Sequence, residues 1–377
     1  MKRMSVAALI LCACFAPVAR GQQPACRFSP LWAEFHKHNM MRWNRCENVL
    51  SVHNVSNLAL KWSYTTGGEI ANLISPTVAG GVVYITSNDD MLYALDAHTG
   101  TKLWSDNIGF SVSSSAIAHG LVYVGAGDYN VYALKESTGA KQWSYLTGNS
   151  VYSSPAVRNG VIYVGSDDFN VYALKASTGA ELWKVRTNGL VFSSPAVANG
   201  VVYVGSFDGN LYALDAKTGA YRWSYDTGNY VDSSPAVANG VVYFGSDDFN
   251  VYALKAKTGA MLWSYNAGDY VDSSPAVMNG VVYVGCHNGN VYALDAGTGA
   301  KLWSYLTGDA VLSSPAVANG VVYVGSWDNN VYALNARTGA KLWSYTTGSH
   351  IGSSPTVADG VVYVGSYDNK VYAFGLK

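Results

Sequence analysis

The amino-acid sequence predicts an all-β fold, an eight-bladed β-propeller in which every blade is a sheet of four antiparallel strands. Three observations lead to this prediction. A tryptophan recurs at intervals of 40 residues through most of the chain. The same short turns surround each copy, and eight copies can be counted. Repeats of about 40 residues made of short strands and glycine turns are typical of propeller blades.

One repeat, residues 194–228, illustrates the strand pattern. Apolar, β-branched and tyrosine-rich segments at 194–198, 201–206, 211–215 and 220–225 predict its four strands. Asn199-Gly200 predicts a tight hairpin turn, because the central positions of such a turn need residues that tolerate positive φ. Thr218-Gly219 predicts the turn between the third and fourth strands. Both turns lie on the same face of the ring.

The blade count follows from the residues that open each repeat. A Ser-Pro pair or a variant of it opens the blades at Pro76, Ser115, Pro155, Pro195, Pro235, Pro275, Pro315 and Pro355. The eighth blade stops after its third strand, whereas an isolated strand at 60–64 precedes the first blade. We expect this N-terminal strand to complete the last blade, since closure removes the exposed sheet edges. The predicted propeller spans residues 58–377.

The recurring tryptophans have a structural explanation. A large ring at one position per blade fills the wedge between neighbouring sheets, and its indole N–H can donate to a carbonyl there. We assign this docking role to Trp62, Trp104, Trp143, Trp183, Trp223, Trp263, Trp303 and Trp343.

The N-terminus predicts export. Lys2 and Arg3 precede an apolar run at 6–16, and small residues follow, so residues 1–21 resemble a secretory signal peptide. Residues 22–57 form a lead-in to the propeller. We expect a secreted or periplasmic protein. A lipid anchor at Cys14 is the alternative. In an oxidising compartment Cys26 and Cys46 can pair in a disulfide.

Composition excludes two further classes of partner. The chain has 24 basic and 25 acidic residues, a formal net charge of -1, so nothing favours binding to nucleic acid. The apolar run at the N-terminus is too short for a transmembrane segment. We expect a monomeric ring.

The segment Ala216–Trp223 closely resembles the tryptophan-docking motif of quinoprotein-like propellers, whose repeat is named after pyrroloquinoline quinone. The resemblance covers residues 58–377. It implies one of two activities. Catalytic members are periplasmic alcohol dehydrogenases that hold the quinone over the central channel with Ca²⁺. Non-catalytic members include the propeller subunit of the outer-membrane β-barrel assembly machinery, which binds protein partners.

The residues favour a non-catalytic scaffold that binds protein partners. Catalytic members carry two adjacent cysteines against the quinone, and this sequence has no Cys-Cys pair. The blades have a uniform length without insertions that could build a cover or a pocket. We therefore expect no cofactor, no catalytic residue and no metal ligand. A dehydrogenase that uses pyrroloquinoline quinone and calcium, and a glycan-binding surface module, are the alternatives.

A candidate binding rim follows from comparing the repeats with one another. Strand cores and the Asn-Gly and Thr-Gly turns stay constant, whereas the connections between blades and the turns between second and third strands vary. Variable loops on a constant scaffold are typical of a binding surface, although drift at exposed turns is an alternative. The candidate residues are Tyr129, Tyr152, Phe169, Phe192, Phe207, Tyr230, Asp232, Phe249, Tyr270, Asp272, His287, Trp327, His350 and Tyr367.

Two features of this rim have competing explanations. Asp232 and Asp272 occupy equivalent positions near Asp247 and Asp248 and could hold Ca²⁺. Aspartate in such segments is first of all a turn former, and we expect that role. The histidines of the rim have no partner at metal-ligand spacing in the sequence, so we expect them to be solvated or hydrogen-bonded.

Overall fold

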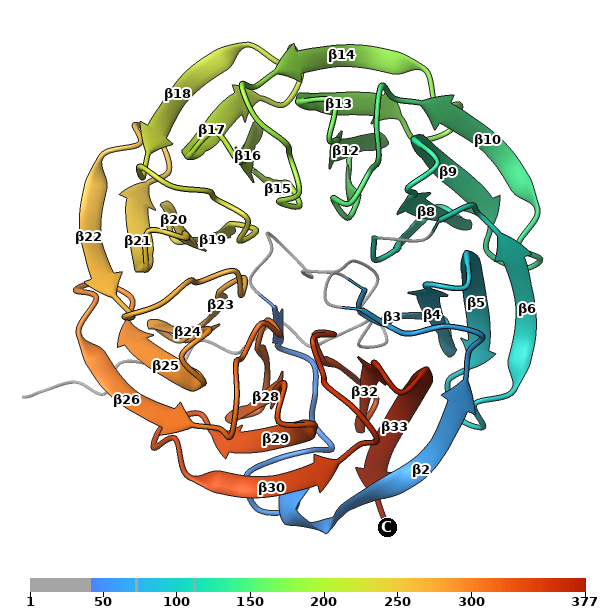
Figure 1. Cartoon of the computed structure of the whole chain (residues 1–377), viewed down its shortest axis with the longest axis vertical. Helices are drawn as coiled ribbons and strands as arrows, with labels where there is room; N and C mark the ends of the chain where they lie inside the picture. Colours follow the sequence, from blue (N-terminus) through green and yellow to red (C-terminus); the bar gives the residue numbers. More distant parts are fainter. Residues whose placement is uncertain (1–41, 72–73, 111–112) are drawn as a thin grey trace, which may run out of the picture.

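A computed structural model describes residues 42–71, 74–110 and 113–377. Its strands form eight sheets around a central channel, with the first strand of each sheet innermost and the fourth outermost (Figure 1). The four repeat strands of each blade pair antiparallel, as in blade 4. The prediction of an all-β, eight-bladed propeller is therefore confirmed. The predicted signal peptide and Cys26 lie outside the described residues.

Blades 1 to 4 follow one another along the chain. Blade 1 comprises β3 (Thr77–Ala79), β4 (Val82–Ser87), β5 (Met91–Asp96) and β6 (Lys102–Asn107). Blade 2 comprises β7 (Ala116–Ala118), β8 (Leu121–Gly125), β9 (Asn130–Lys135) and β10 (Lys141–Leu146). Blade 3 comprises β11 (Ala156–Arg158), β12 (Val161–Gly165), β13 (Asn170–Lys175) and β14 (Glu181–Arg186). Blade 4 comprises β15 (Ala196–Ala198), β16 (Val201–Gly205), β17 (Asn210–Asp215) and β18 (Tyr221–Asp226).

The remaining blades repeat the pattern and include the strands from the N-terminal segment. Blade 5 comprises β19 (Ala236–Ala238), β20 (Val241–Gly245), β21 (Asn250–Lys255) and β22 (Met261–Asn266). Blade 6 comprises β23 (Ala276–Met278), β24 (Val281–Gly285), β25 (Asn290–Asp295) and β26 (Lys301–Leu306). Blade 7 comprises β27 (Ala316–Ala318), β28 (Val321–Gly325), β29 (Asn330–Asn335), β30 (Lys341–Thr346) and β1 (Trp43–Asn44). Blade 8 comprises β31 (Thr356–Ala358), β32 (Val361–Ser366), β33 (Lys370–Leu376) and β2 (Leu58–Thr65). A 3₁₀ turn, η2 (Val55–Asn57), precedes β2.

The hairpin turns adopt the backbone that their residues predict. Asn199 and Gly200 both have positive φ, 51° and 76°, as a primed two-residue turn requires. Between the third and fourth strands the turn ends on Gly219 at φ 73°, and the strand pairing then shifts by one residue ahead of Trp223. This bulge places the tryptophan ring towards the neighbouring blade.

The ring closes as the sequence predicts. β2 pairs antiparallel with β33, from Leu58 opposite Leu376 to Thr65 opposite Lys370. The N-terminal strand thus supplies the outermost strand of blade 8 beside the C-terminal strand, and Figure 1 shows the two side by side. A second closing contact lies nearby, where the indole N–H of Trp343 donates to the main-chain oxygen of Leu58 at 3.0 Å.

Each docking tryptophan joins one blade to the next. Its indole N–H donates to a main-chain carbonyl of the following blade, as Trp183 does to Ala216 and Trp223 does to Ala256, both at 3.1 Å. The ring packs on the glycine of the next Thr-Gly turn: a Cβ built on Gly259 would lie 2.7 Å from the Trp223 ring. A side chain at that glycine would therefore clash. The tryptophans contribute both packing and a satisfied donor.

A ring of eight serines lines the inside of the channel. The hydroxyl of each serine accepts a hydrogen bond from the backbone N–H of its counterpart in the preceding blade, at 2.9–3.1 Å. The last bond, from the N–H of Ser354 to Ser75, completes the circle across the closure. The members are Ser75, Ser114, Ser154, Ser194, Ser234, Ser274, Ser314 and Ser354. Every innermost strand is thereby tied to its neighbour.

The described part of the lead-in, residues 42–57, packs against blades 7 and 8. β1 extends blade 7 as a parallel fifth strand beside β27, which the sequence analysis did not foresee. The buried guanidinium of Arg42 donates to the main-chain oxygens of Pro315 and Pro355 at 2.8 and 2.9 Å. Asn319, in an Asn-Gly turn, donates to the carbonyl of Leu50 at 2.9 Å. This segment therefore packs on the face that carries the Asn-Gly turns, at blades 7 and 8.

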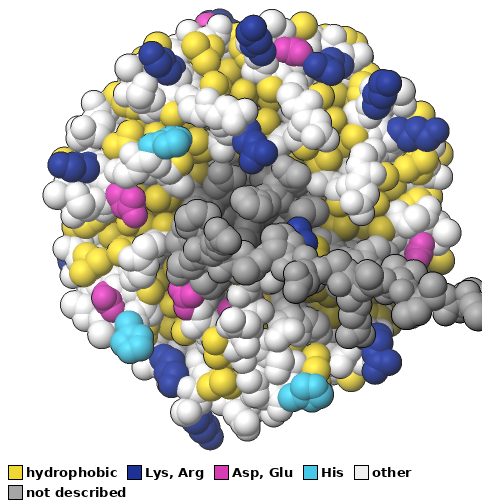
Figure 2. All heavy atoms as spheres, turned by 180° about the vertical axis from the view of Figure 1, so that it is seen from behind, with side chains coloured by type: hydrophobic (Ala, Val, Ile, Leu, Met, Phe, Trp, Pro, Cys, Tyr) yellow, Lys and Arg dark blue, Asp and Glu magenta, His cyan; other side chains and the backbone are white. Residues whose placement is uncertain are grey.

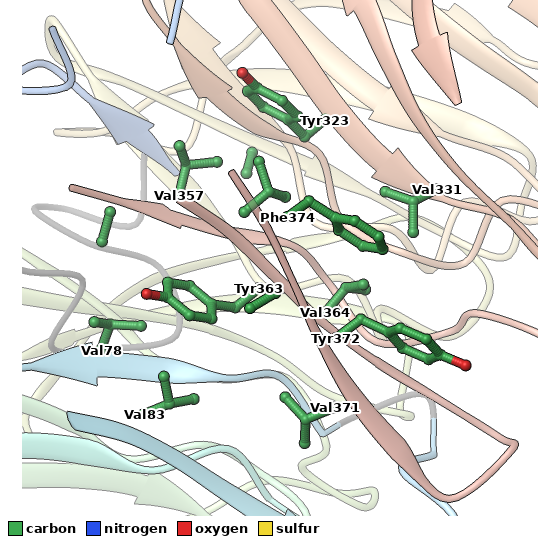
Figure 3. Packing of buried hydrophobic residues seen from close by; sticks show 14 of the residues in the cluster. Val78, Val83, Tyr323, Val331, Val357, Tyr363, Val364, Val371, Tyr372 and Phe374 are labelled. Atoms are coloured by element: carbon green, nitrogen blue, oxygen red, sulfur yellow. The ribbon is translucent and has the colours of Figure 1, made fainter. Parts of the chain in front are cut away.

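Apolar packing between blades completes the core. Figure 3 shows one cluster where blades 7, 8 and 1 meet, with side chains from all three blades, among them Tyr323, Phe374 and Val78. Figure 2 shows the molecule from behind relative to Figure 1, and Lys and Arg side chains stand singly around its perimeter. They do not gather into one patch on that face.

Candidate functional site

The connections between blades and the turns between second and third strands meet at one mouth of the channel. A cavity of about 330 Å³ lies there. Six members of the serine ring form part of its wall, and side chains from the variable positions form much of the remainder. The lining residues from those positions are Asn88, Phe110, Tyr152, Phe192, Asp232, Asp272, Leu312 and Tyr367.

Four aromatic side chains from blades 3 to 5 form an aromatic ladder along one side of the mouth. Tyr152 contacts Phe192 with ring centroids 4.8 Å apart, and Phe192 contacts Phe207 at 4.6 Å. Phe207 then stacks on Tyr230 at 4.7 Å with an interplanar angle of 10°. The sequence analysis named all four as rim residues. The structure brings them into one continuous row.

Four carboxyl groups, Asp167, Asp232, Asp247 and Asp272, gather on the adjoining part of the mouth; we call them the carboxyl cluster. They come from blades 3, 5 and 6. Each has a buried Oδ1 without a hydrogen-bond partner. A buried polar atom without a partner costs free energy, so the cluster is an unfavourable arrangement in the protein alone.

The surroundings raise the pKa of three of these groups. Burial, followed by the charges of Asp272 and Asp247, raises the pKa of Asp232 well above its ordinary value. Burial and then Asp272 raise the pKa of Asp247 to about 7. For Asp167, burial and the neighbouring Asp168 raise the pKa to about 7. The cluster therefore gains negative charge as the pH rises through neutrality.

His287 joins the cluster through an ion pair. Its Nε2 lies 2.7 Å from Oδ2 of Asp272, and this hydrogen bond raises the pKa of the imidazole. Asp247 also interacts with Asp272, and in its neutral form it can donate a hydrogen bond to that carboxylate. Tyr270 packs edge-on against the His287 ring at 5.7 Å, and it contacts Phe249 at 5.3 Å with the two rings tilted. The sequence did not reveal the pairing of His287 with Asp272, because 15 residues separate them.

A third group of rim residues lies in blades 7 and 8. The ring of His350 stacks on Trp327 with centroids 5.5 Å apart, and its Nδ1 hydrogen-bonds to the main-chain oxygen of Trp327. Tyr367 packs edge-on against His350 at 6.4 Å. Aromatic contacts thus occur at the rim from blade 3 to blade 8.

Consecutive aspartates of the rim turns have different roles. Asp168 and Asp248 are turn formers: their carboxylates accept from the backbone N–H two residues later and from a strand tyrosine. Asp167 and Asp247, one residue earlier in the chain, belong to the carboxyl cluster and make no such turn contact through Oδ1. The turn-former explanation therefore applies to the second aspartate of each pair.

Five of the fourteen predicted rim residues line the cavity, and Tyr129 and Phe169 are among the nine that do not. Tyr129 is 45% exposed at the tip of its turn, and the ring of Phe169 lies under the guanidinium of Arg186 at 5.0 Å. Both, like Phe249, have φ of 75°, a conformation that strains bulky residues. Other blades place Gly209 or Asn329 at the equivalent position. The aromatic residues there are costly for the fold.

The sequence analysis left Phe110 and Leu312 out of its candidate rim, and the structure places both in the cavity wall. Phe110 lies 40 residues before Ser150 and is 49% exposed, so the register of the repeat could have identified it. Cys286 replaces the serine of other blades and is buried. Burial raises the pKa of its thiol to about 11.

Three further findings concern the other predictions. Within the described part of the chain, no three His, Cys, Asp or Glu side chains are arranged to hold a metal ion. No helix among the described residues is long and apolar enough to cross a membrane. Cys46 is disulfide-bonded; its predicted partner Cys26 lies outside the described residues, so the pairing stays a prediction.

Comparison with solved structures places the fold among known propellers. BamB from Moraxella catarrhalis superposes with a TM-score of 0.73 and 22% identity, covering 85% of this chain and 98% of that one. The quinohemoprotein alcohol dehydrogenase ADHIIG from Pseudomonas putida HK5 superposes with a TM-score of 0.81 and 19% identity, covering 92% and 80%. At these identities the likeness shows the fold alone.

Curated relatives match over short segments. The quinoprotein alcohol dehydrogenase PedH of Pseudomonas putida is 37% identical over 59 residues, 15% of this chain and 10% of that protein. The quinoprotein ethanol dehydrogenase of Pseudomonas aeruginosa is 38% identical over 68 residues, 18% and 11% of the two chains. The matches thus span about a tenth of the length of these relatives.

One family model matches nearly the whole propeller. It is described as outer membrane protein assembly factor BamB and matches residues 49–154, 130–266, 229–315 and 287–377. The four matched segments overlap, as is expected for a chain made of similar repeats. Together with the tryptophan-docking contacts, this match shows that the chain belongs to the BamB family of propellers built from quinoprotein-type repeats.

Proposed function

We propose that this chain is a non-catalytic scaffold of the periplasm or the cell exterior, and that it holds a protein partner on the rim around the channel mouth. The observation that carries this proposal is the exposure of large aromatic side chains on that rim. Tyr230, Tyr270 and Phe249 are 47%, 43% and 40% exposed. Aromatic residues supply much contact area at small entropic cost and are enriched in protein interfaces.

The energetics of the rim support a binding role. Phe249 adopts a strained backbone where other blades use glycine or asparagine, which can take this conformation at lower cost. An aromatic residue at such a position weakens the fold, and binding to a partner is a reason for its presence. Membership of the BamB family agrees with this proposal, because that family is named after an assembly factor.

The cavity does not fit the quinone of the dehydrogenase relatives. Pyrroloquinoline quinone carries three carboxylate groups, which need cationic or hydrogen-bond-donating partners. Among the residues that the structure describes, the cavity wall contains the carboxyl groups of Asp232 and Asp272 and no Lys or Arg. Placing a polyanion there would add like charges in a partly buried site, which is costly. We therefore derive no reaction through this cofactor.

Photo-crosslinking tests the proposed scaffold. A photoreactive phenylalanine analogue at Tyr270 or Phe249 should yield discrete protein adducts in whole cells, because both side chains protrude from the rim. The same analogue at Leu302, 52% exposed on the outer strand β26, serves as the control. Adducts of equal yield at all three positions, or none at the rim, would contradict the proposal.

The dehydrogenase remains the second candidate, favoured by the segments of 37–38% identity to quinoprotein alcohol dehydrogenases. A ligand of the native state must raise the melting temperature. The quinone and Ca²⁺ together should therefore stabilise a dehydrogenase and support reduction of a dye by alcohols. The scaffold predicts no shift in melting temperature and no dye reduction.

A further inference from the structure

The cavity at the channel mouth has an imbalance of charge that the rim-binding function does not use. Two members of the carboxyl cluster, Asp232 and Asp272, line it, and Asp272 is paired with His287. The charges of the other three members, Asp272, Asp247 and Asp167, all raise the pKa of Asp232. Its Oδ1 is buried without a partner. Bringing a positive charge into the cavity would stabilise this group.

The adjoining part of the wall is aromatic. Phe192 and Tyr152, the inner members of the aromatic ladder, line the same cavity as Asp232. Aromatic faces carry partial negative charge and attract cations within about 6 Å of the ring centroid. The carboxyl cluster and the aromatic ladder therefore favour the same kind of ligand. Neither favours an anion.

Size and spacing favour an organic cation over a compact metal ion. At about 30 Å³ per water, a cavity of about 330 Å³ has room for roughly ten waters, which suits an alkyl group with a charged head. The carboxyl groups come from three blades, and the rings of Phe192 and Phe207 from blade 4 lie between Asp167 and Asp232 in the order of the ring. A delocalised or bulky cation can contact such a dispersed set of groups, whereas Ca²⁺ requires several oxygens within about 2.6 Å.

We propose that the channel-mouth cavity is a binding site for an ammonium or guanidinium group, held between the carboxylate of Asp232 and the rings of Phe192 and Tyr152. The group can belong to a free amine or to a lysine or arginine side chain of a protein. Its three residues belong to the candidate rim, but the site does not include Tyr230, Tyr270 or Phe249, the exposed residues on which the scaffold function rests. The site therefore stands or falls separately from that function.

Calorimetric titration of the mature chain with butylammonium, propylguanidinium and tetramethylammonium chloride tests this proposal. We expect saturable one-to-one binding of at least one of these probes at pH 8. Affinity should fall at least tenfold at pH 5, because the pKa of Asp232 is raised and its carboxyl group loses its charge as the pH falls. The groups whose charges act on Asp232 are Asp167, Asp247 and Asp272, and Asp272 is paired with His287.

The repeat supplies variants that the fold accommodates. Blade 7 carries Leu312 at the position of Asp232, so Asp232→Leu should fold and lower the affinity at least tenfold. Phe192→Leu should lower it several-fold, the effect of one lost cation–π contact. The matched control is Asp226→Asn, which removes the same charge from an exposed site and keeps the oxygen that accepts from the N–H of Gly228. This control should leave the affinity unchanged.

Comparing the affinities for a peptide and for a free amine identifies the source of the cation, and three other results would overturn the proposed site. A short Gly-Ser peptide with one lysine that binds at least tenfold more tightly than butylammonium would assign the group to a protein. Equal affinities would assign it to a free amine. Absence of saturable binding by every probe, an equal loss in Asp226→Asn and Asp232→Leu, or tight Ca²⁺ binding that no organic cation displaces would overturn the proposal. Crosslinking at the rim would be unaffected in each case.

Discussion

The two faces of this ring are built from the same number of turns per blade but follow opposite rules. On the face of the Asn-Gly and Thr-Gly turns, every position with positive φ in blade 5 is asparagine or glycine, as at Asn239, Gly240 and Gly259. On the mouth face the same blade places Phe249 at φ 75° and leaves oxygens of two aspartates without partners. One face minimises strain, and the other tolerates it. The contrast shows where stability is maintained and where it is given up.

Deleting residues 58–66 tests the ring as a whole and should have the largest effect. The deletion removes β2. Strand β33 would therefore lose its outer partner strand, and the indole N–H of Trp343 would lose the Leu58 carbonyl to which it donates. We expect loss of the cooperative thermal transition or aggregation, because an open edge is exposed. Circular dichroism and size-exclusion chromatography would measure this. A monomer with an unchanged melting temperature would show that blade 8 does not need its outer strand.

A pair of glycine substitutions tests whether the tryptophan contact on the turn face adds to the cost of backbone strain. Gly259→Ala places a methyl group 2.7 Å from the Trp223 ring at φ 71°, and we expect a loss of roughly 2–4 kcal/mol. Gly240→Ala in the same blade has φ 79° but no atom within 4 Å, and should cost only about 1 kcal/mol. Urea unfolding would compare them. Equal losses would mean that the docking contact adds nothing to the backbone strain.

The pH dependence of stability tests the mouth face. Asp167 and Asp247 have a pKa raised to about 7 from 3.8, so the folded protein binds more protons than the unfolded chain between these values. Stability should therefore fall as pH rises from about 4 through 7. The raised pKa of His287 acts in the same direction, since its contribution is present below pH 6.5 and lost above its folded pKa.

Melting temperatures from pH 5 to 8 at constant ionic strength would show a decline of several degrees, and Asp247→Asn should flatten it. The pKa of Asp168 and that of Asp328 are lowered, so these two carboxylates change the stability only in more acidic solution. They therefore do not contribute to the decline between pH 5 and 8. A melting temperature that increases towards pH 8 would contradict the raised pKa of Asp167 and Asp247.

The smallest effect is expected at a single strained position. Tyr129→Asn replaces a half-exposed aromatic at φ 75° by a residue that tolerates this conformation, as Asn329 does in blade 7. Stability should rise by up to about 1 kcal/mol. Chemical denaturation would measure it, with Tyr221→Asn, exposed on the outer strand, as the control that should not gain. A loss of stability in Tyr129→Asn would mean that the ring makes favourable contacts.

Most of the fold could be predicted from the sequence because its determinants are local and repeated. The Asn199-Gly200 turn, the position of Trp223 and the unpaired strand near Trp62 each specify their own surroundings. β1 could not be predicted, since Trp43 and Asn44 pair with residues more than 270 positions away and carry no periodic signal.

The site was predictable in its residue types but not in its grouping. Comparing repeats identified Tyr152, Phe192 and Phe207 as variable, and the structure placed them in one ladder. Of two adjacent aspartates in a rim turn, one makes the turn contacts and the other belongs to the carboxyl cluster, and the residue types alone do not show which is which. Asp247 therefore became separable from Asp248 only through the contacts each makes.

The closure of blade 8 has a consequence for the time order of synthesis. β2 is made first among the strands of its blade, and its partner β33 ends one residue before the last residue of the chain. About 300 residues separate Thr65 from Lys370, which at 5–20 residues per second is roughly 15–60 s of translation. Throughout that interval β2 lacks its partner strand, so the ring can be sealed only after β33 has been made. A product truncated before β33 stays open.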